Sequence, residues 1–367
     1  MNVIFIITGL NIGGAERQVC DLADALSSKN INVKIISLTG QTITTPLSKN
    51  ISIDELKMSK NPFSFIKALV YARYIIKNFH PDIVHSHMVH ANLFSRFLRI
   101  IIKIPVLICT AHSTYEGSKI RALLYRATDF LCDLTTNVSN EAVKSSIKNK
   151  SVPKNKIITM YNGIDIQKYT FNPLNRKKLR NSLNIGENSH LLLSVGRLTL
   201  AKDYPNLLYA YAQIKAKNPN SQLVIIGDGI EKENILNLSK KLGVSNSTHF
   251  LGFRTDVNEW MSAADIFILS SEWEGFGLVV AEAIACKCLV VATNSGGVKE
   301  VLNCHRFLVP IKDHDSLSTS VIQAINLNDM ERKKIIDDSY LHVIKNFTLD
   351  NISAEWIKIY SRLLKLK

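Results

Sequence analysis

The chain has 367 residues, of which 46% are hydrophobic and 21% charged, and this composition excludes a disordered, collagen-like or coiled-coil protein. No run approaches the roughly 20 apolar residues of a membrane-spanning helix. The net charge of +14 lies in the first half: residues 1–186 hold 25 Lys and Arg against 11 Asp and Glu, whereas residues 187–367 hold 20 of each. This asymmetry indicates an anionic partner, such as nucleic acid, a phosphorylated molecule or an anionic membrane surface.

The first half alternates short apolar runs with helical patterns such as residues 15–28. This rhythm predicts a parallel sheet with helices on both faces. The N-terminal run lacks the basic leader of a secretion signal, so we interpret it as the first strand. The strands expected in this half are Val3–Ile7, Val33–Leu38, Ile83–His85, Val106–Thr110, Leu134–Val138 and Ile157–Met160.

Two segments of this half, Phe63–Phe79 and Asn92–Lys103, interleave apolar residues with Lys and Arg. Both predict basic amphipathic helices of the kind that lie on a membrane surface. A helix packed on the sheet with a solvated basic face is the alternative. We expect no nucleic acid partner, because the sequence has no helix-turn-helix, zinc-finger or aromatic RNA-binding signature.

The second half begins the same pattern again after a polar link at about residues 172–189, so the length divides into two doubly wound domains. In such sheets, ligands bind at the carboxyl ends of the strands, and a cleft between two of them is the natural site. The strands expected here are Leu191–Val195, Gln222–Ile226, Thr248–Leu251, Ile266–Ser270 and Leu289–Ala292. The helices are Tyr204–Lys217, Glu231–Leu242, Val257–Ala263, Leu278–Ala285, Asp315–Asn326 and Ile352–Leu366.

Six cysteines occur, and none forms a Cys-x-x-Cys pair. We interpret them as buried thiols of a reducing compartment, with a zinc site as the weaker alternative.

Gly13 and Gly14 lie between the first strand and the first helix. They allow the backbone to approach a ligand, and the helix N-terminus offers N–H groups to an anion, although a plain tight turn explains them equally well. The Gly-x-Gly-x-x-Gly fingerprint is absent, which disfavours a nicotinamide dehydrogenase.

Arg197 directly follows a predicted strand, and Lys202 comes five residues later. Two cations at a strand's carboxyl end suit a pyrophosphate; a solvated loop is the alternative. The turns at 226–229 and 251–254 end two further strands. A glycine beside an aromatic there can admit a flat ring, but turn chemistry alone also explains them.

The densest motif is residues 270–283, where Glu274 and Glu282 flank Gly-Phe-Gly. Gly275 and Gly277 free the N–H groups of a helix start for phosphate oxygens, and a carboxylate can accept paired sugar hydroxyls.

With these motifs in order over essentially the whole chain, the sequence resembles the retaining glycosyltransferases of family four. That family has the GT-B fold, an α/β architecture of two doubly wound Rossmann-like domains facing a central cleft. The residues that carry the resemblance are Glu274 and Glu282 (Glu-x7-Glu), Gly13 and Gly14, Gly196, Arg197 and Lys202, Tyr161–Asp165, and Asp82, His85 and His87.

The resemblance implies an acceptor-side domain over 1–172, a nucleotide-sugar-binding domain over 173–351, and a C-terminal helix over 352–367 that packs back on the first domain. It implies that Glu274, at the donor sugar, and His112, near the reaction centre, are catalytic. The implied donor-binding residues are Gly14, Arg197, Lys202, Phe253, Gly277, Leu278, Val279 and Glu282, and the acceptor-side candidates are Gly13, Arg17 and His87.

We expect no metal and no cofactor, because Arg197, Lys202 and a helix N-terminus already offset the charge of a leaving diphosphate. His85, His87 and His90 could form a metal cluster, but we interpret them as strand-end residues near the acceptor. The Asp313–Asp315 triplet is similar to a metal motif of a different glycosyltransferase fold and lies away from the nucleotide motifs. Val298 and residues 303–307 depart from the family pattern, which leaves the donor's identity open.

The expected reaction moves a hexose or N-acetylhexosamine from a nucleotide diphosphate sugar, UDP-linked by family habit, to a hydroxyl of a lipid-linked glycan. The product would belong to a surface polysaccharide, O-antigen or capsule. The enzyme would be cytoplasmic, on the inner face of the cell membrane, and a front-side displacement would explain retention. A nucleotide-sugar epimerase or hydrolase of the same fold, or a non-catalytic binding protein, is the alternative.

Overall fold

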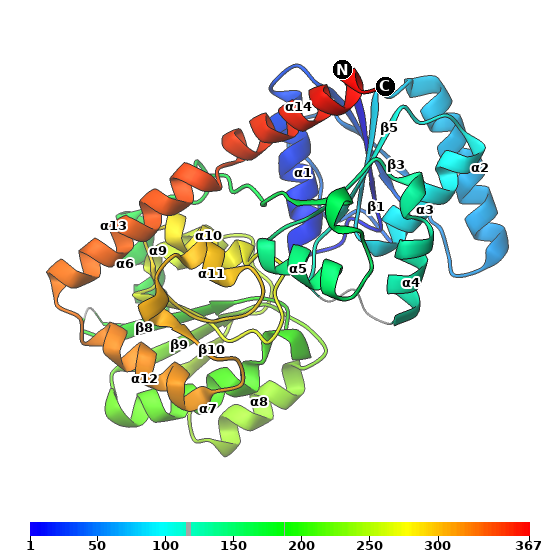
Figure 1. Ribbon diagram of the computed structural model, residues 1–367. Helices are drawn as coiled ribbons and strands as arrows, with labels where there is room; N and C mark the ends of the chain where they lie inside the picture. Colours follow the sequence, from blue (N-terminus) through cyan, green and yellow to red (C-terminus); the bar gives the residue numbers. More distant parts are fainter. Residues whose placement is uncertain (115–118, 187) are drawn as a thin grey trace. The chain divides into compact units, whose positions relative to one another are not determined.

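The computed structural model describes residues 1–114, 119–186 and 188–367. The chain forms two units: unit 1 comprises Met1–Gly163 and Leu349–Lys367, and unit 2 comprises Ile164–Thr348. Each unit is a parallel sheet between layers of helices (Figure 1). The predicted fold class, two doubly wound α/β domains, is confirmed.

The sheet of unit 1 has seven strands in the order β3-β2-β1-β4-β5-β6-β7, all parallel. The chain first adds strands on one side of β1 and then on the other, so the strand order reverses between β1 and β4. The strands are β1 (Asn2–Ile7), β2 (Asn32–Ser37), β3 (Ser52–Glu55), β4 (Ile83–His87), β5 (Val106–Ala111), β6 (Leu134–Asn137) and β7 (Ile157–Thr159).

Helices cover both faces of this sheet (Figure 1). One face packs against α1 (Gly14–Ser27) and α14 (Leu349–Lys365), which contributes the buried Ile352, Trp356 and Tyr360 from one side of its helix. The other face packs against α2 (Pro62–Phe79) and α3 (Val89–Ile101). The shorter elements are α4 (Lys119–Ala127), α5 (Asn140–Lys148), η1 (Asp129–Leu131) and η2 (Lys154–Lys156).

The sheet of unit 2 has six parallel strands in the order β10-β9-β8-β11-β12-β13, so its strand order reverses between β8 and β11. The strands are β8 (His190–Val195), β9 (Ser221–Ile226), β10 (Thr248–Phe250), β11 (Ile266–Leu269), β12 (Leu289–Thr293) and β13 (Leu308–Val309).

The helices of unit 2 also form two layers (Figure 1). The first layer is α7 (Tyr204–Lys217), α8 (Lys232–Lys241) and α12 (His314–Ile325), whose apolar residues share one core with the sheet. The second layer holds α6 (Pro173–Ser182), α9 (Val257–Ala263), α10 (Leu278–Ala285), α11 (Val298–Leu302) and α13 (Asp329–Asn346). Single turns complete the unit: η3 (Leu200–Lys202), η4 (Ser245–Ser247) and η5 (His305–Phe307).

The polar stretch that we predicted as a link is instead part of unit 2. It contains α6, which begins after Asn172, whose side chain caps it, and which packs on α9. Arg176 and Arg180 both form ion pairs with Asp265. Burial raises the pKa of Asp265, but the two guanidinium groups outweigh burial and hold it below its usual range. Basic residues that suggested a solvated linker therefore face a carboxylate inside the unit.

None of the helices in the described ranges combines the length and the apolar character that a transmembrane span requires.

Candidate active site

The carboxyl ends of β8 and β11 bring the charged motifs of unit 2 together. In open parallel sheets, the point where the strand order reverses leaves a crevice at the carboxyl ends of two neighbouring strands. Lys202 lies in η3, just after β8, and Glu274 lies in the loop after β11. The Lys202 Nζ and Glu274 Oε1 atoms are 2.5 Å apart, and these side chains are only 20% and 10% exposed. Ser271 Oγ also donates to this carboxylate oxygen, at 2.7 Å.

The loop after β8 is held against the loop after β9 by close backbone packing. Gly196 donates its N–H to Ile226 O at 3.0 Å. Gly227 has a φ of +145°, and a Cβ atom at this position would lie 1.9 Å from Gly196 O. Only glycine fits both the conformation and the space. This packing fixes the backbone on which Arg197 and Lys202 stand.

Arg197 is exposed at the end of β8. Within the described residues, its guanidinium forms neither an ion pair nor a hydrogen bond, unlike Lys202. The two cations that the sequence placed together therefore differ: one is paired with a carboxylate and the other is open to an incoming anion.

The helix start predicted to contact phosphate is α10. It begins after Gly277, whose φ of +93° suits glycine, and Val298 Cγ2 lies 3.1 Å from where a Cβ would be. Leu278 and Val279 form its first turn and are half-buried, and Glu282 lies one turn further along, also half-buried. Among the other donor candidates, Phe253 is 56% exposed in the turn after β10.

The side chain of Glu16 covers the backbone at Gly13, the first residue of the glycine pair in unit 1. A Cβ atom on Gly13 would lie 2.3 Å from Glu16 Oε2, so the carboxylate of Glu16 lies against the backbone where we expected an anion. Gly14 is the first residue of α1, and Arg17 is paired with Asp21 on the same helix at 2.8 Å.

A cluster of histidines lies at the carboxyl ends of β4 and β5, within unit 1. His85 is fully buried; its Nδ1 lies 2.7 Å from the Tyr360 hydroxyl and its Nε2 lies 2.6 Å from Thr110 Oγ1. Both ring nitrogens are satisfied, so His85 is a structural residue. His87 is 2% exposed, and its Nδ1 lies 3.1 Å from Nε2 of His112.

These histidines are neutral at physiological pH. Burial lowers the pKa of His112 to about 4, and it lowers the pKa values of His85 and His87 well below their ordinary value. His90 is exposed on α3 and takes no part in the cluster. Across the described ranges, no group of three His, Cys, Asp or Glu side chains has the arrangement of a metal site.

The Asp313–Asp315 triplet serves local structure. Asp313 Oδ1 accepts from the N–H of Ser316 at 2.9 Å and caps α12, while Asp315 accepts from Gln213 Nε2 at 2.6 Å. This is helix-capping chemistry.

The helices α2, α3 and α4 of unit 1 expose apolar and basic side chains together. Phe65 of α2 packs edge-on against Phe94 and Phe97 of α3, and both α3 and α4 contact η1. No Asp or Glu occurs in α2, α3 or α4. We call the exposed side chains of these elements, together with Lys103 just after α3, the apolar–basic surface: Phe63, Ile66, Val70, Tyr71, Tyr74, Phe97, Ile100, Ile101, Ile120, Leu123, Leu124 and Phe130, with Lys67, Arg73, Lys77, Lys103, Arg121 and Arg126.

Sequence reasoning missed several of these features. It did not include α4 or Phe130 in the surface, since Ile120, Leu123 and Leu124 form a short pattern that had no separate signal. It also missed the partners of His85, because Tyr360 lies 275 residues away along the chain.

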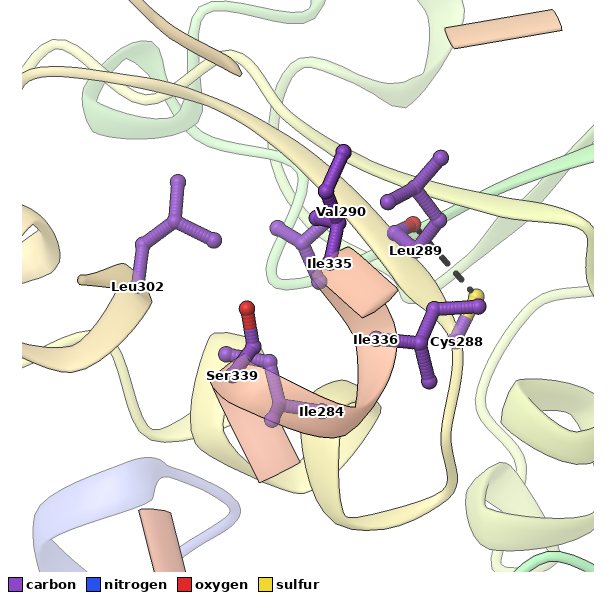
Figure 2. Close-up of a pocket in the computed structure, with 8 residues that line it drawn as sticks. All are labelled: Ile284, Cys288, Leu289, Val290, Leu302, Ile335, Ile336 and Ser339. Carbon is purple, nitrogen blue, oxygen red and sulfur yellow. Dashed lines mark hydrogen bonds between the residues drawn. The ribbon is translucent and has the colours of Figure 1, made fainter. Parts of the chain in front are cut away.

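A hollow in unit 2 is a poor alternative site. Its walls come from α10, β12, α11 and α13, and Figure 2 shows that aliphatic side chains line most of it, with Ser339 and Cys288 as the polar exceptions. Binding sites need several converging polar groups to orient a ligand. We interpret the hollow as a gap in the packing of α13.

Comparisons with known proteins agree with this geometry. Residues 12–168 match the family model described as Glycosyltransferase Family 4, and residues 175–341 match the one described as Glycosyl transferases group 1.

Two curated relatives are each 28% identical to this chain. One is the N-acetylgalactosamine-N,N'-diacetylbacillosaminyl-diphospho-undecaprenol 4-alpha-N-acetylgalactosaminyltransferase of Campylobacter jejuni, with 86% of this chain and 87% of the relative covered. The other is the UDP-Gal:alpha-D-GlcNAc-diphosphoundecaprenol alpha-1,3-galactosyltransferase of Escherichia coli, with 88% and 81% covered.

Among solved structures, Anabaena HepE in complex with UDP has a TM-score of 0.84 at 21% identity, with 99% of this chain and 100% of that chain covered. This likeness shows the GT-B fold over the full length. Since two family models together match most of the chain and the motifs occupy the carboxyl edges of both sheets, the chain belongs to the family 4, group 1 glycosyltransferases, a retaining family of enzymes that use nucleotide sugars.

Proposed function

We propose that this enzyme transfers a sugar from a UDP-sugar to a hydroxyl of a lipid-linked oligosaccharide, in the synthesis of a surface polysaccharide such as O-antigen or capsule. The names of the Campylobacter jejuni and Escherichia coli relatives specify diphospho-undecaprenol acceptors. The Escherichia coli relative uses UDP-Gal, and the HepE structure contains UDP. These relatives support both the donor and the acceptor class.

The observation that carries the donor assignment is the Lys202–Glu274 ion pair at the reversal point of the unit 2 sheet. A diphosphate bears more negative charge than one carboxylate and competes for the Lys202 ammonium. Arg197, at the end of the same strand, adds a second cation with a planar fork suited to phosphate oxygens. Glu274 then exchanges its ammonium partner for hydroxyls of the donor sugar, and Glu282 accepts from the ribose.

The chemical step forms one bond and breaks one. The acceptor oxygen bonds to the anomeric carbon as the bond from that carbon to the diphosphate oxygen breaks. The acceptor's proton passes to the leaving diphosphate, whose negative charge Arg197, Lys202 and the start of α10 stabilise. Within unit 1, His112 is a neutral group that can donate or accept a hydrogen bond, since its low pKa leaves it unprotonated at neutral pH.

A panel of nucleotide sugars with a lipid-diphosphate glycan primer tests the reaction. We expect one donor to release its nucleoside diphosphate only when the primer is present, and mass spectrometry to find the primer heavier by one sugar. Donor turnover without primer would indicate an epimerase or hydrolase. Tight donor binding without turnover of any donor in the panel would indicate a binding protein.

We further propose that the apolar–basic surface of unit 1 binds the cytoplasmic face of an anionic membrane, where a lipid-linked acceptor would be found. Exposed Phe63, Ile66 and Val70 lie on one side of α2 at the spacing of an amphipathic helix, and Lys67 and Arg73 are exposed on the same helix. Basic side chains near anionic lipid each contribute about 1 kcal/mol of attraction.

Vesicle flotation tests this binding. We expect the enzyme to float with anionic vesicles and to remain with the soluble fraction in neutral ones. The double variant Phe63→Glu, Ile66→Glu should lose flotation. Met330→Glu, at an 82% exposed apolar position of unit 2, is the matched control and should float like the wild type. Equal indifference to both kinds of vesicle would remove the proposal.

A further inference from the structure

The hydrogen bond between two neutral histidines, His87 and His112, has a direction that the surrounding structure constrains. β4 and β5 are adjacent and parallel, with His87 opposite Thr110, so the strand ends place His87 beside His112. The His87 Nδ1 and His112 Nε2 atoms are 3.1 Å apart, and the ring centroids are 5.4 Å apart.

The His87 ring is held firmly. It is 2% exposed, with the Phe5 ring edge-on at 5.1 Å and the His85 ring at 4.1 Å. His85 is itself fixed by one hydrogen bond at each of its ring nitrogens. His112 is less enclosed, being half-buried at the start of the loop after β5. The rigid ring of the pair therefore sets the orientation of the more accessible one.

Two ring nitrogens of the pair are buried and make no hydrogen bond with the described residues: Nε2 of His87 and Nδ1 of His112. Because both rings are neutral, each carries one proton, and the shared bond decides where both protons lie. His112 Nδ1 is closed to solvent in this structure, but the His112 ring is half-buried at the strand ends, so a bound substrate would meet this ring rather than that of His87, and His87 Nε2 stays unpartnered. A buried N–H without an acceptor is rarer than a buried acceptor without a donor. This favours a bare Nε2 and a protonated Nδ1 on His87.

We propose that His87 is a positioning residue: its Nδ1–H donates to His112 Nε2 and so holds His112 in the tautomer that presents an Nδ1–H donor to an oxygen of the substrate. The identity of that oxygen, a hydroxyl of the donor sugar or of the acceptor, rests on the proposed function. The tautomer assignment rests on the two rings alone. His87 thus acts through His112 and does not need to touch the acceptor.

The test compares two replacements of His87. His87→Asn keeps an N–H donor close to the position of Nδ1, whereas His87→Leu fills similar space without one. We expect the ¹⁵N NMR spectrum of histidine-labelled wild-type enzyme, with His112 assigned by its loss in His112→Asn, to show His112 protonated at Nδ1 and bare at Nε2. His87→Asn should keep this pattern, and His87→Leu should move the proton to Nε2 or mix the two forms.

Turnover gives the second measurement. Loss of one net hydrogen bond corresponds to about fivefold, so we expect His87→Leu to lower kcat about fivefold with little change in the KM for the donor. His87→Asn should recover most of that loss. Circular dichroism and the unfolding temperature establish that both variants are folded.

An unchanged His112 tautomer in folded His87→Leu, or equal turnover of the two variants, would overturn the proposal. If the wild type turned over no nucleotide sugar, the proposed function would fail while the NMR comparison still decided the role of His87. The two failures are therefore distinguishable.

Discussion

The two units share one topology and differ in where they keep their charge. Both sheets reverse their strand order beside their first strand, at β1/β4 and at β8/β11. Unit 1 has 24 Lys and Arg against 12 Asp and Glu, whereas unit 2 has 21 against 19. Yet the reversal point of unit 1 ends in neutral histidines, and that of unit 2 ends in a half-buried ion pair and an arginine that has no ionic partner in the described part of the chain.

This difference separates two uses of charge on one scaffold. Unit 2 places Lys202 and Arg197 at the carboxyl edge of its sheet, where the partial burial of Lys202 would strengthen its attraction to a phosphate. Unit 1 spreads cations over the exposed sides of α2, α3 and α4, where we propose that they act collectively on an anionic membrane surface. The topology sets where a ligand binds, and the side chains at that edge set which chemistry it meets.

The largest expected effect comes from breaking the charged edge of unit 2. Lys202→Ala and Glu274→Ala should each reduce transfer at least a hundredfold if, as we propose, each removes a group that acts on charge developing in the transition state. Lys232→Ala, which removes an exposed ion pair with Asp228 in the same unit, is the control and should retain activity. Initial rates and unfolding temperatures check both effects. Wild-type turnover in Lys202→Ala or in Glu274→Ala would refute the site assignment.

The next effect concerns the backbone beneath that edge. Gly227→Ala should destabilise unit 2 by about 3 kcal/mol or more, since the new Cβ would overlap Gly196 O and the φ of +145° is unfavourable for alanine. Gly243→Ala has a φ of +70° but open space around it, and it should cost only about 1 kcal/mol. Denaturant unfolding measures the free energy of unfolding of both variants. Equal losses would show that the loop at Gly227 rearranges to accommodate the new Cβ atom.

Acid should destabilise unit 1 because its buried histidines are neutral in the fold. An unfolded histidine has a pKa near 6.5, whereas His112 in the fold has a pKa of about 4. The unfolded chain therefore binds more protons between these values, and the free energy of unfolding falls as the pH drops through this window. His112 alone accounts for about 2 kcal/mol between pH 7 and 5, and His85 and His87 act in the same direction. Between pH 7 and 5, the free energy of unfolding of His112→Asn, measured by denaturant titration, should fall less than that of the wild type. An equal fall in the two proteins would contradict the low pKa of His112.

The smallest expected effect is that of chelation. We propose that Arg197, Lys202 and the start of α10 supply positive charge to the leaving diphosphate, so EDTA should leave turnover within about twofold of its starting value. Activity that disappears with EDTA and returns with a divalent cation would show that these groups are insufficient.

The sequence predicted the fold class and most inner strands because those strands are continuous apolar runs. It missed β3, since Ser52–Glu55 is a polar edge strand, and β13, which has only two residues. It missed α13, whose apolar side chains are few and dispersed. It mistook the residues of α6 for a link, because nothing local shows that Arg176 and Arg180 meet Asp265, more than 80 residues away.

The candidate site, like the fold, could be predicted only where its residues are close together in the sequence. Motifs within one loop, such as Gly277 beside Glu274, could be recognised because their spacing is short. Three pairings could not be predicted: Lys202 with Glu274, His87 with His112, and His85 with Tyr360. Each joins distant segments, and only the strand order brings them together. Likewise, the sequence spacing did not predict that the Glu16 carboxylate lies against Gly13.

The return of α14 to unit 1 has a consequence for biosynthesis. Ile352, Trp356 and Tyr360 belong to the core of unit 1, so this core stays open until α14 has left the ribosome. Unit 2 is complete once Thr348 has emerged. Although domains usually fold in the order of translation, unit 1 begins first here and is completed after unit 2. A nascent chain truncated before α14 would expose the apolar residues that α14 covers to chaperones and proteases.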